Sequence, residues 1–248
     1  MPGSQPAEKK PEEAKKPEDA KKPEAKKPEE TKKPEDAKKS DTKKPVDLTE
    51  LKKKNLPVVI VMGGPGCGKG TQCDKIKGKY GYTHLSTGDL LRADVASGSA
   101  RGKELSAIMA KGELVSLAIV MDLLKEAMVV ALPTSKGFLI DGFPRDMEQA
   151  EKLTAELGMP RVVINFECND KILSDRCMER GKKSGRVDDN PESVKKRIET
   201  YHKQTMPVAE YYKKNNKLQV VKAERKVDEI FADVAKIIDK ECAAAPAK

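Results

Sequence analysis

The chain has 248 residues, a formal net charge of +9 and 37% hydrophobic residues, which is enough for one or two globular domains. No apolar run approaches the ~20 residues that a membrane-spanning helix needs, so we expect no membrane insertion. Five cysteines lack the spacing of a metal or disulfide motif, which, with no secretory signal, favours a reducing compartment and a cytoplasmic protein. Two histidines are too few for a histidine metal site.

Residues 1–45 form a low-complexity segment in which Lys-Lys pairs recur every five or six residues, mostly followed by Pro-Glu. The segment holds 14 lysines, 11 acidic residues and no aromatic residue, so it has almost nothing to bury in a core. We therefore expect a disordered tail over 1–55, a globular domain over 56–242 and a flexible end over 243–248.

The tail has a net charge of only +3, which makes it a poor nucleic-acid clamp, and we expect no nucleic-acid partner. Two interpretations of it stay open. It is a plain spacer, or its repeated units direct the protein to a cytoskeletal or organellar partner.

From about Pro57 onward, short β-rich runs alternate with helical patterns, which predicts a parallel sheet with crossover helices. The predicted strands are Val58–Met62, Thr83–Leu85, Phe138–Ile140, Val162–Phe166 and Leu218–Val221. The predicted helices are Lys69–Lys79, Gly88–Ser97, Ala100–Lys111, Leu117–Ala131, Asp146–Leu157, Lys171–Arg180, Pro191–Lys214 and Val227–Lys240.

Two stretches do not fit simple crossovers. The span 86–116 reads as a helical insertion after the second strand, and 181–190 as a polar, glycine-containing loop between two helices. Ligands of parallel sheets bind at the carboxyl ends of the strands, so we interpret both stretches as mobile flaps over a site at that edge.

Residues 63–72, Gly-Gly-Pro-Gly-Cys-Gly-Lys-Gly-Thr-Gln, match the pattern G-x-x-x-x-G-K between a predicted strand and a predicted helix. Glycines let backbone N–H groups approach a phosphate, Lys69 adds a charge, and the helix adds its positive end. Gly70 stands where Ser or Thr is usual, and the hydroxyl follows at Thr71. An ordinary glycine-rich turn is the alternative interpretation.

Further charged residues follow the predicted strands. Asp141 comes directly after Phe138–Ile140, where a carboxylate can hold a hydrated Mg²⁺, although a turn residue is the alternative. Arg145 can grip a phosphate with two parallel hydrogen bonds. Four more arginines flank or occupy the polar loop, which favours phosphate binding over a solvated helix face: Arg176, Arg180, Arg186 and Arg197. Asp188 and Asp189 either hold this loop closed or keep it soluble.

Four segments together resemble the short-lid adenylate kinases of the nucleoside monophosphate kinase family. They are 63–72, 84–92, 137–145 and 180–189, in the family's order, and the resemblance covers about 56–241. In that family the position of Gly70 is also glycine. The resemblance implies an α/β P-loop fold, a parallel five-stranded sheet flanked by helices, with an AMP-binding helical insertion over 86–115 and a short lid over 180–190. It implies in-line phosphoryl transfer that converts ATP and AMP to two ADP.

The resemblance also implies roles for single residues. ATP would be bound by Gly64, Gly66, Cys67, Gly68, Lys69, Gly70, Thr71, Arg176, Arg180 and Arg225. AMP would be bound by Thr87, Arg92, Glu113, Val115, Gly142, Arg145, Gln149, Arg186 and Arg197. Mg²⁺ would be reached through water by Thr71 and Asp141. Catalysis would depend on Lys69, Arg145, Arg180, Arg186 and Arg197.

The resemblance further implies a monomer, and no zinc, because the lid lacks the cysteines of some long-lid relatives. Some positions depart from the adenylate kinase pattern. Ser116 stands where proline is common, Arg225 where glycine is common, and residues 165–169 resemble UMP-CMP kinases more closely. Thr87 favours AMP, since pyrimidine-specific relatives usually carry alanine there.

Three alternatives remain beside an adenylate kinase. A UMP-CMP kinase is the nearest of them. A binding protein tethered through its tail, with secondary kinase activity, belongs to another class. A GTPase is disfavoured, because Asn216-Lys217 lacks the nearby aspartate that reads guanine.

Overall fold

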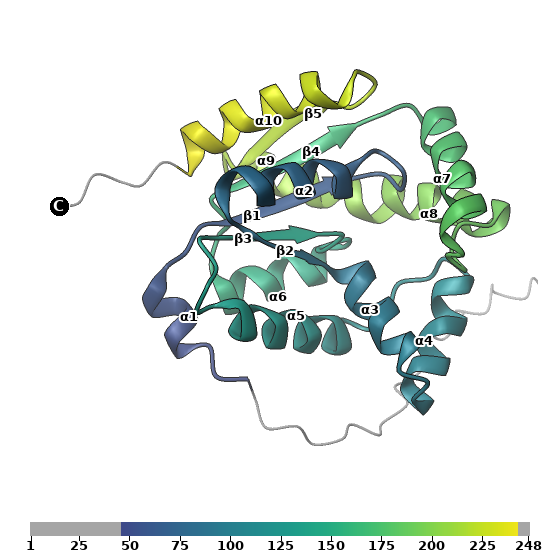
Figure 1. Cartoon of the computed structure of the whole chain (residues 1–248), viewed down its shortest axis with the longest axis horizontal. Helices are drawn as coiled ribbons and strands as arrows, with labels where there is room; N and C mark the ends of the chain where they lie inside the picture. Colours follow the sequence, from purple (N-terminus) through teal and green to yellow (C-terminus); the bar gives the residue numbers. More distant parts are fainter. Residues whose placement is uncertain (1–45, 243–248) are drawn as a thin grey trace, which may run out of the picture. The chain divides into compact units, whose positions relative to one another are not determined.

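The computed structural model describes residues 46–242, so the predictions for 1–45 and 243–248 lie outside the described residues. A five-stranded sheet runs through this part in the order β2-β3-β1-β4-β5, with every neighbouring pair parallel (Figure 1). The predicted α/β fold is confirmed, and each strand ends one residue later than predicted: β1 Val58–Gly63, β2 Thr83–Ser86, β3 Phe138–Asp141, β4 Val162–Glu167 and β5 Leu218–Lys222.

Helices cover both faces of the sheet because successive strand residues point to opposite sides. Val59 and Val61 pack with α2 and α10 on one face, and Ile60 packs with α5, α6 and α9 on the other (Figure 1). The helices are α1 Thr49–Lys54, α2 Lys69–Tyr80, α3 Thr87–Ala96, α4 Ala100–Ala110, α5 Leu117–Ala131, α6 Met147–Leu157, α7 Asp170–Ser184, α8 Pro191–Thr200, α9 Met206–Lys214 and α10 Val227–Glu241. Within residues 46–242, each helix is too short or too polar to cross a bilayer.

Helix α1 lies inside the range that the sequence assigned to the tail. Its Leu51 is buried in the core, and Lys54 Nζ donates to the carbonyl of Leu132 at 3.0 Å. The predicted boundary at residue 55 is therefore too late, since residues 49–54 are folded. A six-residue helix with one buried leucine leaves no periodic pattern by which to recognise it.

Two helix boundaries differ from the prediction as well. Helix α7 continues to Ser184 and ends at Gly185, whose φ of 61° suits glycine, so the predicted loop over 181–190 begins four residues too early. The predicted helix over 191–214 is interrupted by a π-helical turn, η1 Tyr201–Thr205. Pro207 follows this turn and has no N–H to donate, which breaks the regular α-helical ladder there.

Helices α3 and α4 and helices α7 and α8 lie beyond the carboxyl ends of the strands (Figure 1). The two groups touch. Ser193 Oγ in α8 donates to the carbonyl of Ala110 in α4, and Lys196 pairs with Glu113 at 2.9 Å. Arg186, in the second of the stretches that the sequence set apart as flaps, lies 3.6 Å from Asp89 in the first, so both stretches face the same edge of the sheet and meet each other.

Candidate active site

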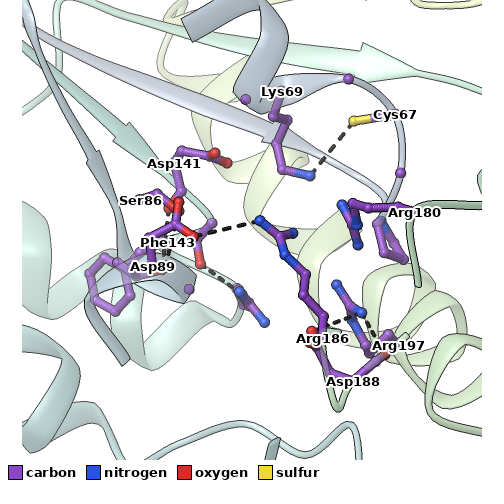
Figure 2. A pocket seen from close by; sticks show the side chains of 18 of the residues that line it. Cys67, Lys69, Ser86, Asp89, Asp141, Phe143, Arg180, Arg186, Asp188 and Arg197 are labelled. Carbon is purple, nitrogen blue, oxygen red and sulfur yellow. Dashed lines mark hydrogen bonds and ion pairs between the residues drawn. The ribbon is translucent and has the colours of Figure 1, made fainter. Parts of the chain in front are cut away.

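The glycine-rich loop connects β1 to α2 in a conformation that only glycine adopts without strain. Gly66 has a φ of 83°, and a Cβ there would lie 2.6 Å from the carbonyl oxygen of Leu173. Gly68, with a φ of 97°, is the N-cap of α2. Lys69 Nζ donates to the carbonyls of Gly63 and Gly64, each at 2.9 Å. The ammonium group thus lies across the mouth of the loop, close to Cys67 (Figure 2).

A cavity of about 680 Å³ extends from this loop to the carboxyl ends of β2 and β3, between the two helical flaps. All predicted site residues line it except Gly64, which is buried beside Leu173. The structure therefore brings together Gly66, Cys67, Gly68, Lys69, Gly70, Thr71, Thr87, Arg92, Glu113, Val115, Asp141, Gly142, Arg145, Gln149, Arg176, Arg180, Arg186, Arg197 and Arg225.

Arg180 of the lid and Arg197 of α8 are held by carboxylates. Arg180 makes two hydrogen bonds of 2.7 Å to Asp189, and Arg197 Nη1 lies 3.0 Å from the same carboxylate and 2.9 Å from Asp188. Burial raises the pKa of Asp189, but the hydrogen bonds and charges of both arginines outweigh it, so the pKa lies below its ordinary value. The two aspartates order Arg180 and Arg197.

Arg186 reaches in the other direction, from the lid to α3. Its Nη2 lies 3.6 Å from Asp89, which Arg92 also contacts at 2.5 Å (Figure 2). Burial lowers the pKa of Arg186, and the charges of Arg92 and Arg180 lower it further. Asp89 was not among the predicted site residues. The sequence could have pointed to Asp89 as a site residue only through its position in segment 84–92, one of the four segments that resemble the family.

Arg145 lies deep in the cleft, where its Nε donates to the carbonyl of Gly142 at 2.7 Å. Burial, helped by the charge of Arg197, lowers the pKa of Arg145 to about 10, so the guanidinium is still charged at neutral pH. Its backbone is fixed from both sides: its N–H donates to Gln149 Oε1 at 2.8 Å, and its carbonyl accepts from Thr205 Oγ1 at 2.7 Å. Such a desolvated cation is suited to an anionic ligand.

Three of the predicted ligands direct their side chains elsewhere. Cys67 is buried and its Sγ accepts from Lys69 Nζ at 3.6 Å, Glu113 pairs with Lys196, and Arg225 Nη2 pairs with Asp233 at 2.7 Å. At these positions the backbone is the part left to contact a nucleotide in this conformation. Arg176, by contrast, donates to the carbonyl of Ala223 at 3.2 Å and lines the cavity.

Two of the predicted AMP-binding residues also have internal partners. Thr87 is buried and its Oγ1 donates to the carbonyl of Asp141 at 3.2 Å. Gln149 is buried as well, and its Oε1 already accepts the N–H of Arg145. We therefore expect the amide NH₂ of Gln149, and not its carbonyl, to be the group that reads the base.

Comparison with known proteins places the chain in a family. A family model described as adenylate kinase matches residues 61–217, which is more than half of the chain. The chain belongs to the adenylate kinase family. Adenylate kinase isoenzyme 1 of Sus scrofa is 53% identical over 190 residues, covering 77% of this chain and 98% of that protein. The Caenorhabditis elegans isoenzyme 1 is 48% identical over 196 residues, covering 79% and 93%.

The human adenylate kinase isoenzyme 1 is 52% identical over 190 residues, with 77% of this chain and 98% of that protein covered. The segment matched by the adenylate kinase model holds every lining residue named above except Ala223 and Arg225. Residues 1–60 lie before this match.

Proposed function

We propose that this adenylate kinase transfers the γ-phosphoryl group of ATP to AMP, reversibly, in the cavity between its two flaps. One observation carries the proposal. The phosphate loop and the arginines Arg92, Arg145 and Arg186 line the same cavity from opposite sides, so the phosphates of two nucleotides can meet inside it. Family membership supports the reaction, and the arrangement of the cavity supports the assignment of the residues.

The mechanism depends on charge and position, because phosphoryl transfer leaves little covalent chemistry to the protein. Lys69 moves from the carbonyls of Gly63 and Gly64 to the outer phosphates of ATP. Arg92 and Arg145 hold the phosphate of AMP. The lid arginines Arg180 and Arg186, together with Arg197 of α8, surround the transferring group and, with Arg176, exclude water from it.

The donor set at the cleft suits Mg²⁺ bound with ATP. The carboxylate of Asp141 is nearly buried at the end of β3, and the hydroxyl of Thr71 is exposed in the first turn of α2. Both side chains line the cavity and offer the oxygen ligands that Mg²⁺ prefers. The ion supplies neutralisation of phosphate charge when bound, and Thr71 and Asp141 would hold its water shell.

We expect AMP to be preferred over CMP and UMP by at least about 100-fold in kcat/KM, because a site built to pair with adenine leaves polar groups unmet by a pyrimidine. Coupled assays with ATP and each monophosphate separately measure this ratio. Gln149→Leu, which removes the amide and keeps the bulk, should raise the KM for AMP. Equal efficiency with CMP would favour the UMP-CMP kinase alternative.

The tail contributes no predicted ligand, so deleting residues 1–45 is expected to leave kcat, KM and melting temperature nearly unchanged. Residues 46–55 must be kept, because α1 packs Leu51 into the core. A large loss of activity in this truncated form would contradict the domain boundary. Imaging full-length and truncated forms in the source cell then separates a plain spacer from a segment that directs location.

A further inference from the structure

Three metal-ligating side chains from distant parts of the sequence converge behind the phosphate loop. Cys73 lies on α2, His84 on β2, and Asp141 at the end of β3. One donor atom of each, a sulfur, a ring nitrogen and a carboxylate oxygen, lies within 4.8 Å of the other two. In the part of the chain from 46 to 242, no other three His, Cys, Asp or Glu side chains meet this condition.

The trio is largely shielded from solvent but is connected to the cleft. Cys73 is completely buried, and the side chains of His84 and Asp141 are 14% and 11% exposed. His84 and Asp141 line the cavity, and Cys73 does not. A cation that enters the cleft therefore meets the carboxylate and the imidazole before it reaches the thiol.

The donor chemistry selects a particular class of cation. Mg²⁺ prefers oxygen ligands alone, whereas zinc binds thiolate, imidazole and carboxylate together in tetrahedral sites. His84 Nε2 lies 3.4 Å from Asp141 Oδ2, so the imidazole and the carboxylate already face each other. The other ring nitrogen, Nδ1, lies 3.9 Å from Asp74 Oδ1, which is too far for a direct hydrogen bond.

We propose that Cys73, His84 and Asp141 form an inhibitory site for Zn²⁺, with the fourth position open to water or phosphate in the cleft. On binding, the thiol releases its proton to solvent and a sulfur–zinc bond forms. Asp141 then ligates zinc and is no longer available to hold the water shell of Mg²⁺, so zinc inhibits turnover. The claim that zinc inhibits turnover rests on the role of Asp141 in the proposed function. The claim that zinc binds the three side chains does not rest on it.

Binding is tested with Co²⁺ as a spectroscopic substitute for zinc, added to the nucleotide-free full-length protein. We expect a thiolate-to-cobalt charge-transfer band that zinc displaces, and that Cys73→Ala lacks. Cys168→Ala is the matched control, because Cys168 is partly exposed and outside the trio, and it should keep the band. Absence of the band in the wild type, or its persistence in Cys73→Ala, would overturn the proposal.

Inhibition is tested by titrating zinc into the forward assay with Mg²⁺ in excess. Cys73 has no role in the mechanism above, so Cys73→Ala should keep its basal turnover. Its half-inhibitory zinc concentration should rise by at least about tenfold, the loss that even outer-sphere partners of a metal cause. An unchanged zinc sensitivity refutes the site, whereas failure to use AMP without zinc refutes only the proposed function. His84→Gln, which keeps the thiol, should show the same resistance and covers the case in which Cys73→Ala fails to fold.

Discussion

Replacing Lys69 by methionine is expected to lower kcat by about 10²- to 10³-fold, the loss typical of removing one charge-stabilising donor from a water-excluded site. Methionine matches the lysine side chain in length and shape as far as Cε and removes the ammonium group. Steady-state rates with ATP and AMP measure the effect, and thermal unfolding shows whether the variant is folded. Within residues 46–242, Lys69 bonds loop carbonyls and the Cys67 sulfur only, so we expect a change in stability that is small beside the catalytic loss.

Lys77→Met is the matched control, since Lys77 lies on the exposed side of the same helix α2. It should keep wild-type kcat and KM. Near-normal turnover in Lys69→Met would reject the assignment of the glycine-rich loop as the phosphate site. A parallel loss in Lys77→Met would show that the effect comes from the helix and not from the phosphate contact.

Arg145→Met is expected to lower kcat/KM for AMP by roughly 30- to 5,000-fold, which corresponds to the about 2–5 kcal/mol that truncation of one partner of a buried charge pair costs. The guanidinium is desolvated beside the like charge of Arg197, and both effects lower its pKa. Removing it should therefore leave the melting temperature of the nucleotide-free protein unchanged or higher.

The two readouts separate a binding role from a structural one. Scanning fluorimetry with and without AMP should show that the variant has lost most of the stabilisation by AMP. Arg161→Met, at an exposed position before β4, serves as the control and should behave as wild type. A strongly destabilised Arg145→Met that still binds AMP normally would show that this arginine supports the fold only.

Local patterns predicted the sheet and the phosphate loop well, because their signals lie within a few consecutive residues. Each strand is a short apolar run, and the glycines with Lys69 identify the turn between β1 and α2. The arginines were predicted as a group for the same reason, since several flank one polar loop. Which carboxylate holds which arginine could not be predicted. Asp189 forms ion pairs with Arg180 and Arg197, while Arg186 forms one with Asp89 in α3.

The remaining features depend on how distant segments meet. The convergence of Cys73, His84 and Asp141 depends on the register of β2 with β3, which pairs His84 with Leu139 and Ser86 with Asp141. The spacing of Cys73, His84 and Asp141 along the sequence does not predict that they converge. The burial of Leu51 likewise requires the surface formed by α5 and its neighbours.

The π-helical turn η1 joins α8 and α9 and changes which direction the side chains of the continuous helix face. An α-helix advances by about 100° per residue, so the extra residue of a π turn rotates everything after it by about that angle. Before the turn, Arg197 faces the cleft; after it, Val208 and Tyr212 face the core. Shortening the turn by one residue would put these two sets out of phase. The length of segment 201–205 is therefore constrained, and sequence changes there should be substitutions and not insertions or deletions.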